Sequence, residues 1–93
     1  MVEIKLNEVV RRGCDLVHAL NVNSLYIYYT EVTDVALELD GMLSAMRAEH
    51  PAASDAIAKA QGTIDYVLIN LEVLEATTIA DKLANVIALL ISF

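Results

Sequence analysis

The sequence contains few of the residues that cross-link small domains or interrupt helices. Its 93 residues include one cysteine, one proline, three glycines and no tryptophan. A single cysteine excludes an internal disulfide, so packing must hold the fold together, and a reducing cytosol is the expected setting. With 57% hydrophobic residues and so little proline and glycine, the composition also excludes a disordered, collagen-like or low-complexity chain.

Positive charge is scarce as well. Six Lys and Arg stand against thirteen Asp and Glu, which gives a formal net charge of −7. Binding to nucleic acids is driven by counterion release from phosphates, and binding to membrane surfaces by attraction to anionic lipids. Both kinds of binding need basic residues on the protein. We therefore expect no nucleic-acid partner and no membrane partner.

Apolar runs of bilayer length are missing too. The longest stretches without Asp, Glu, Lys or Arg are residues 16–30 and 83–93, and both are shorter than the roughly 20 residues that cross a bilayer. Charges within the first twelve residues interrupt the apolar segment that a secretion signal needs. The sequence thus predicts neither a transmembrane helix nor an export signal, and a cytoplasmic location.

Apolar residues at helical spacing are abundant, and they predict a single all-α domain over residues 1–93. We expect helices over residues 7–20, 25–49, 52–74 and from residue 79 toward the end. Asn7, Ser54 and Thr78 are the expected N-caps of three of them, and His50-Pro51 should end the second. Residues 2–6 alternate in polarity, which fits a short edge strand or a frayed lead.

The two central helices each carry an apolar seam with heptad spacing. The first seam comprises Leu25, Tyr28, Val32, Val35, Leu39, Met42 and Met46, and the second comprises Ile57, Ala60, Ile64, Val67, Leu71 and Leu74. The short connection between them predicts an antiparallel hairpin. A helix over residues 25–49 would be ~37 Å long, so we expect an elongated hairpin flanked by shorter helices in a four-helix-bundle-like arrangement. Gly41 and Gly62 inside it are interpreted as points of tight helix contact.

More apolar surface is present than one small chain can hide. The mean hydropathy is +0.53, and a second apolar row lies opposite the seam of the third helix. Coverage by the two outer helices within one protomer is one interpretation. The favoured one is an obligate homo-oligomer, in its simplest form a dimer. The predicted interface residues are Tyr66, Ile69, Val73, Leu89 and Phe93.

Few residues suggest catalytic or metal chemistry. Cys14 and His18 are four residues apart on a predicted helix, which is half of a zinc site. We interpret the pair as a buried thiol beside a surface imidazole. The sequence therefore predicts no cofactor, no metal site and no catalytic residue.

Acidic residues on residues 25–49 are the best candidates for function. Glu31, Asp34 and Glu38 share one helix face, and Tyr26, at the start of the same helix and off its seam, supplies an aromatic ring with a polar tip. An acidic face of this kind suits a basic protein partner. We therefore predict a non-enzymatic adaptor, regulator or inhibitor that acts through protein-protein interaction.

An enzymatic alternative rests on a resemblance. The segment Glu31-Val-Thr-Asp34 resembles the Glu-x-x-Asp helix of the all-α nucleotide pyrophosphatases, over one or two helix turns. The Glu-Glu-x-x-Glu motif that precedes it in that family has no counterpart here. The resemblance implies Mg²⁺-dependent hydrolysis with Glu31, Asp34, Glu72 and Glu75 as paired carboxylates.

Overall fold

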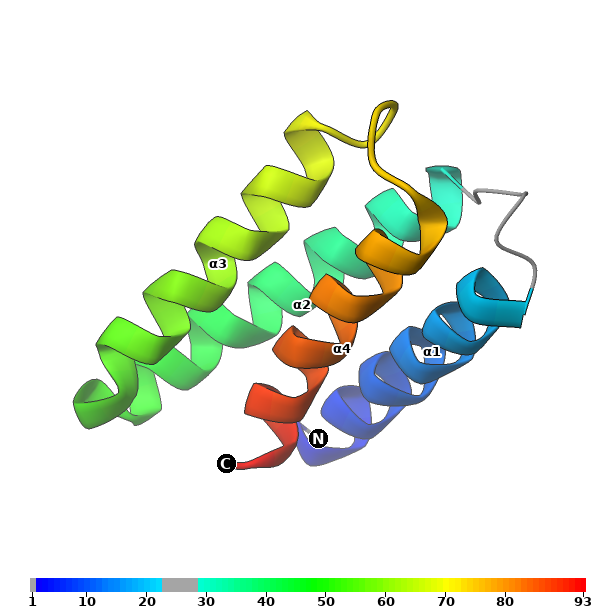
Figure 1. Ribbon diagram of the computed structural model, residues 1–93. Helices are drawn as coiled ribbons and strands as arrows, with labels where there is room; N and C mark the ends of the chain where they lie inside the picture. Colours follow the sequence, from blue (N-terminus) through cyan, green and yellow to red (C-terminus); the bar gives the residue numbers. More distant parts are fainter. Residues whose placement is uncertain (1, 23–28) are drawn as a thin grey trace.

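The protein is a bundle of four α-helices. The computed structural model describes residues 2–22 and 29–93, with side chains from Leu6 onward. The helices are α1 (Val2–Val22), α2 (Tyr29–Glu49), α3 (Ser54–Ile69) and α4 (Ala76–Ile91), and a 3₁₀ helix, η1 (Pro51–Ala53), joins α2 to α3. Figure 1 shows α1 beside α4 and α2 beside α3. The predicted all-α, bundle-like fold is confirmed, and no described helix has the length and apolarity to cross a membrane.

The helix α2 ends where the proline predicts. It stops at Glu49, and His50 has φ −127° and ψ 71°, outside the helical region. The residue before a proline is pushed away from helical geometry, and Pro51 then occupies the start of η1, where its missing N–H costs nothing. The predicted first turn of this helix, residues 25–28, lies outside the described residues.

Two side-chain hydrogen bonds show that α2 and α3 run antiparallel. Arg47 Nε donates to Ser54 Oγ at 2.9 Å, and Gln61 Nε2 donates to Ser44 Oγ at 3.0 Å. Later residues of α3 therefore pair with earlier residues of α2. The predicted N-cap at Ser54 is wrong, because Ala53 holds that position and the Ser54 hydroxyl accepts from Arg47.

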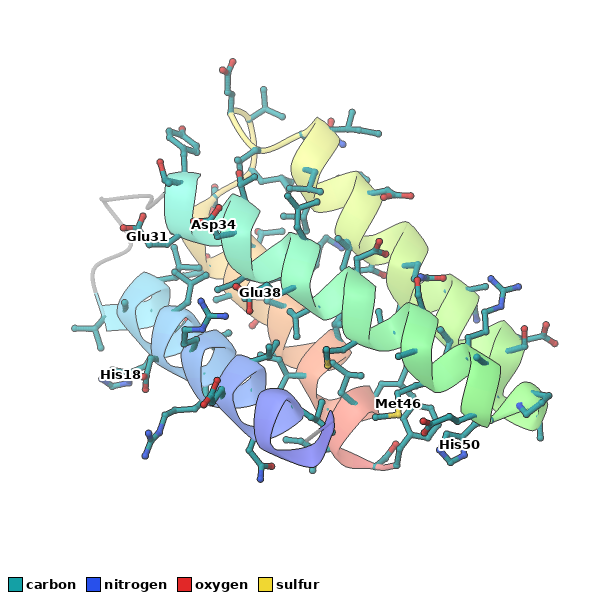
Figure 2. The ribbon with its side chains drawn as sticks, turned by 180° about the vertical axis from the view of Figure 1, so that it is seen from behind. His18, Glu31, Asp34, Glu38, Met46 and His50 are labelled. Carbon is teal, nitrogen blue, oxygen red and sulfur yellow. The ribbon has the colours of Figure 1, made fainter. Side chains whose placement is uncertain are left out.

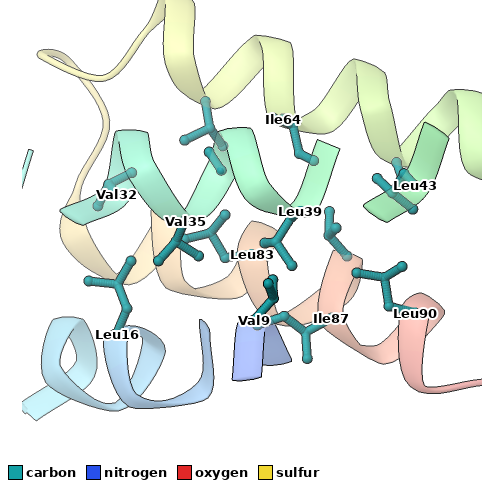
Figure 3. Packing of buried hydrophobic residues seen from close by; sticks show 14 of the residues in the cluster. Val9, Leu16, Val32, Val35, Leu39, Leu43, Ile64, Leu83, Ile87 and Leu90 are labelled. Atoms are coloured by element: carbon teal, nitrogen blue, oxygen red, sulfur yellow. The ribbon is translucent and has the colours of Figure 1, made fainter. Parts of the chain in front are cut away.

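The heptad seams form the core. From α2 the core takes Val32, Val35, Leu39, Met42 and Met46, and from α3 it takes Ile57, Ala60, Ile64 and Val67. Figure 3 shows Leu39 of α2 facing Leu83 and Ile87 of α4, with Val9 of α1 close by. No polar or charged side chain is buried in the part of the chain whose side chains are described. Apolar packing alone accounts for this interior.

The third helix is shorter than predicted. It ends at Ile69, although the seam spacing continues to Leu74. The backbone N–H and the side-chain Nδ2 of Asn70 both donate to the carbonyl of Tyr66, at 3.1 and 2.9 Å. Asparagine competes for backbone groups in this way and favours helix ends. Leu71 and Leu74 still pack against the core, but from the α3–α4 connection.

Two helices begin earlier than predicted. The helix α1 starts at Val2, so residues 2–6 are not a strand and Asn7 is no N-cap. In the sequence Val2 extends the three-four spacing of this helix, which explains its helical state. The helix α4 starts at Ala76 after the N-cap Glu75, so the predicted cap at Thr78 is wrong as well. Ala76 is buried, and the extra turn therefore adds to the apolar side of α4.

The bundle is compact and moderately elongated, since its principal-axis extents are 39 × 24 × 18 Å. The radius of gyration is 12.6 Å, close to the value of about 12 Å for a compact chain of this length. With 21 residues, α1 is as long as α2, and it is not the shorter flanking helix that we expected. Figure 1 shows α1 and α4 lying along the hairpin.

The tight helix contact lies at a different glycine from those predicted. A Cβ at Gly41 or at Gly62 would have no neighbouring atom within 4 Å, so neither marks a close contact. A Cβ at Gly13 would lie 2.7 Å from Cδ1 of Ile87. The close approach of α1 and α4 therefore depends on Gly13 having no side chain.

Candidate functional site

The predicted acidic face of α2 lies beside α1. Figure 2 shows Glu31, Asp34 and Glu38 along the side of α2 that faces α1. Their spacing of three and four residues sets them on one flank of the helix, next to the buried residue Val35. The structure thus brings the three carboxylates together along one border of the hairpin.

Glu31 and Asp34 border a groove of about 430 Å³ between α1 and α2, which we call the acidic groove. Its lining residues are Arg12, Asp15, Leu16, Ala19, Glu31, Asp34 and Val35. The floor is apolar, because Leu16 and Val35 belong to the core. The rim is acidic, because three carboxylates accompany one guanidinium. Sequence analysis missed Asp15, which comes from another helix and joins the site only through the packing of α1 on α2.

The one guanidinium in the groove is already paired. Arg12 forms an ion pair with Glu38, and no other ion pair is present among residues 6–22 and 29–93. The pair is partly exposed, with 53% of the Arg12 side chain and 31% of the Glu38 side chain accessible, so it adds little to stability. Its main effect is on the groove, where it leaves Asp15, Glu31 and Asp34 as the charges facing solvent.

The carboxylates of the enzymatic alternative do not gather at one point. Glu31 and Asp34 line the acidic groove, whereas Glu72 and Glu75 lie in the connection between α3 and α4. Within the described residues, no group of three or more His, Cys, Asp or Glu side chains is placed to share a metal ion. Tyr26, the aromatic residue predicted to contact a partner, lies outside the described residues.

Most of the predicted interface residues are exposed in the single chain. Tyr66 is 47% exposed, Ile69 is 81% exposed and Val73 is 79% exposed, and all three lie at the end of α3 or just after it. We call these three residues the α3 patch. Phe93 is exposed and stacks on His50, with ring centroids 4.9 Å apart. Leu89 is partly buried against the core of its own chain.

A second groove, of about 370 Å³, lies between α1 and α4. Its lining residues are Cys14, Val17, His18, Asn21, Ala84, Ile87, Ala88 and Ile91. Cys14 is exposed, so the interpretation of its thiol as buried is wrong. Cys14 stands at the edge of the apolar side of α1, where α4 covers the residues next to it but leaves the thiol open. Sequence analysis had no signal for this groove, since it pairs two segments about 70 residues apart.

Comparison with known proteins identifies no relative of this chain: no family model, no curated protein and no solved structure matches it.

Proposed function

We propose that this protein acts by binding a basic protein partner in the acidic groove, as an adaptor, regulator or inhibitor without a chemical step of its own. The observation that carries the proposal is the combination found there. Three solvent-facing carboxylates, Asp15, Glu31 and Asp34, surround a floor made by Leu16, Ala19 and Val35. Neither a purely apolar core edge nor a uniformly charged surface has this composition.

The groove suits cationic side chains with apolar stems. Lysine and arginine carry three or four methylene groups below the charge, and these pack on apolar surface while the charge stays at the rim. Hydrogen bonds between such cations and carboxylates are among the stronger ones in proteins. A basic amphipathic helix that lies along α1 and α2 would place both parts of such side chains correctly.

The charge of the whole molecule supports the same partner class. The net charge is −7, so the long-range field attracts basic proteins and raises their association rate. Arg12 does not oppose this attraction strongly, because Glu38 neutralises it. We expect partner affinity to fall as ionic strength rises.

The test compares two triple variants that remove the same charge. One variant, Asp15→Asn with Glu31→Gln and Asp34→Asn, neutralises the acidic groove. The control, with exposed carboxylates changed elsewhere, carries Asp55→Asn, Asp65→Asn and Glu72→Gln. Both are titrated by calorimetry, at several salt concentrations, against a basic partner captured from the source cell and then purified.

The expected result separates a local site from a general charge effect. The groove variant should lose affinity by about tenfold or more, while the control should change it by about twofold or less at matched ionic strength. Equal losses in both variants would mean that net charge alone attracts the partner. An affinity that does not respond to salt would contradict the acidic groove as the binding surface.

Self-association is the second part of the proposal. The observation in its favour is that large apolar side chains stay exposed outside the chain's own core, among them Ile91 and the three residues of the α3 patch. Exposed apolar surface is stabilised by burial against another surface. Light scattering at micromolar concentration measures the molar mass, and a monomer under these conditions would contradict this part.

A further inference from the structure

The groove between α1 and α4 differs in charge from the rest of the surface. None of its eight lining residues is Asp, Glu, Lys or Arg, although 20% of the chain consists of these four types. Val17 and Ile87 form its apolar base, and His18 and Asn21 are its polar members. We call this surface the neutral groove. It lies on the side of α1 that faces α4, whereas the acidic groove lies on the side that faces α2.

We infer that the neutral groove is the surface on which a second copy of this chain docks, as a symmetric dimer. The inference rests on the proposed self-association and assigns it to this face in place of the α3 patch. Two copies with a net charge of −7 each repel one another. Close contact between two copies costs least where the buried surface holds no carboxylate, and no residue that lines the neutral groove carries one.

The shape of this face suits pairing with itself. Ile91 is 62% exposed and stands at one end of the groove, while Ala84 and Ala88 leave room beside it. In a two-fold interface the same patch must supply both the projecting side chain and the space that receives it. Ile91 of each copy can therefore pack over the alanines of the other, and the small residues allow helices to approach closely.

The α3 patch is the competing surface, and its borders are charged. Asp65 and Glu72 are exposed and adjacent in sequence to Tyr66 and Val73. The Lys82 ammonium lies 4.9 Å from the centre of the Tyr66 ring. A two-fold contact here would take these charged groups out of water together with the apolar side chains, and the cost of their desolvation opposes pairing.

The single cysteine reports directly on the proposed dimer. The Cβ position of Gly13 lies 2.7 Å from Cδ1 of Ile87, so the next residue, Cys14, is level with Ile87 and Ala88. This level is between Asn21 at one end of the groove and Ile91 at the other. A two-fold axis through the middle of the neutral groove brings the two Cys14 thiols within reach of a short cross-linker.

Pairing through the neutral groove leaves the acidic groove open. The two grooves lie on different sides of α1, so each copy in the dimer keeps its own acidic groove exposed. A dimer of this kind presents two partner sites in one particle. Partners with two basic segments would bind with higher effective affinity than a single groove provides.

Cross-linking and charge insertion together test the inference. The unmodified protein is treated with a short bis-maleimide, and a variant that moves the thiol to an exposed position of α3, Cys14→Ser with Ala58→Cys, is the control. Separately, Ala88→Glu introduces a charge into the neutral groove, Ala58→Glu introduces the same charge on α3, and Ile69→Glu introduces it in the α3 patch. Light scattering gives the molar mass of each, and circular dichroism checks its fold.

The expected pattern has three parts. The unmodified protein is a dimer that cross-links through Cys14, whereas the relocated thiol does not cross-link. Ala88→Glu gives a folded monomer. Ala58→Glu and Ile69→Glu remain dimers, because their charges lie outside the contact.

Other results would overturn the inference. A dimer that survives Ala88→Glu and dissociates with Ile69→Glu assigns the contact to the α3 patch. A dimer that cross-links only through the thiol at position 58 places the contact on α3. An unmodified protein that is monomeric contradicts self-association itself. The proposed binding of a basic partner is then decided separately, by the calorimetric titration of the acidic groove variant.

Discussion

The three glycines allow one chemical change to be tested in three environments. All three lie inside helices, where Gly→Ala favours folding by about 1 kcal/mol because alanine restricts the unfolded chain and suits the helix. At Gly41 and Gly62 an added Cβ meets no atom within 4 Å. We therefore expect Gly41→Ala and Gly62→Ala each to stabilise the protein by about 0.5 to 1 kcal/mol.

At Gly13 the same change should not stabilise the protein. The new Cβ would lie 2.7 Å from Cδ1 of Ile87 and 3.3 Å from its Cγ1. Ile87 is only 4% exposed and belongs to the core, so moving its side chain away from the new Cβ would disturb its packing against buried neighbours. Overpacking of this kind costs typically 1 to 3 kcal/mol, which equals or exceeds the gain of about 1 kcal/mol from helix propensity. Gly13→Ala should therefore be neutral to destabilising by about 2 kcal/mol.

A double-mutant cycle identifies the cause. Ile87→Val removes the Cδ1 methyl group, so Gly13→Ala in that background should cost less than in the natural chain. Urea denaturation at one fixed protein concentration measures all variants, because self-association would make stability depend on concentration. If Gly13→Ala stabilises as much as Gly41→Ala does, the tight α1–α4 contact is wrong. If Gly41→Ala and Gly62→Ala both destabilise, the outer face of the hairpin is covered in solution.

Three further predictions concern the core, the ion pair and the enzymatic alternative. Leu39→Ala should lower the free energy of unfolding in urea by about 2 to 5 kcal/mol, because Leu39 is fully buried. Leu37 is exposed, so Leu37→Ala should lower it by less than about 1 kcal/mol, and similar losses in the two variants would contradict the orientation of α2. Arg12→Ala should change stability by less than about 1 kcal/mol and should tighten the binding of a basic partner in calorimetry, since it removes the one cation of the acidic groove. With Mg²⁺ and mixed nucleoside triphosphates, an assay that detects released pyrophosphate, after its conversion to phosphate by an added inorganic pyrophosphatase, should show no hydrolysis. A pyrophosphate release that Glu31→Gln abolishes would favour the pyrophosphatase alternative instead.

Local patterns in the sequence were sufficient to predict the central hairpin. Heptad spacing marked Val32, Val35 and Leu39 as core residues, and all three are buried. Pro51 placed the end of α2 correctly, because its ring acts on the residues directly before it. These features depend on side chains close together in the sequence, so a periodic pattern or one special residue predicts them.

Helix ends were predicted less well, since competing signals act there. The seam spacing carried the third helix to Leu74, but the Asn70 side chain bonds the Tyr66 carbonyl and the helix stops before it. Thr78 has the chemistry of an N-cap, yet burial of Ala76 extends α4 by one turn. Whether the apolar spacing or the capping residue sets the end of a helix depends on the packing energy between helices. The spacing of residues along one segment does not give that energy.

The composition of the chain and the spacing of its apolar residues determined that it is helical and acidic. Both grooves, by contrast, exist only because separate helices pack together. Asp15 joins Glu31 and Asp34 because α1 lies on α2, and Cys14 joins Ala88 because the missing side chain of Gly13 lets α1 approach α4. Periodicity along one helix reports which face is apolar, but the energy of close packing between helices decides which faces meet, and so which charged and neutral surfaces remain open to a partner.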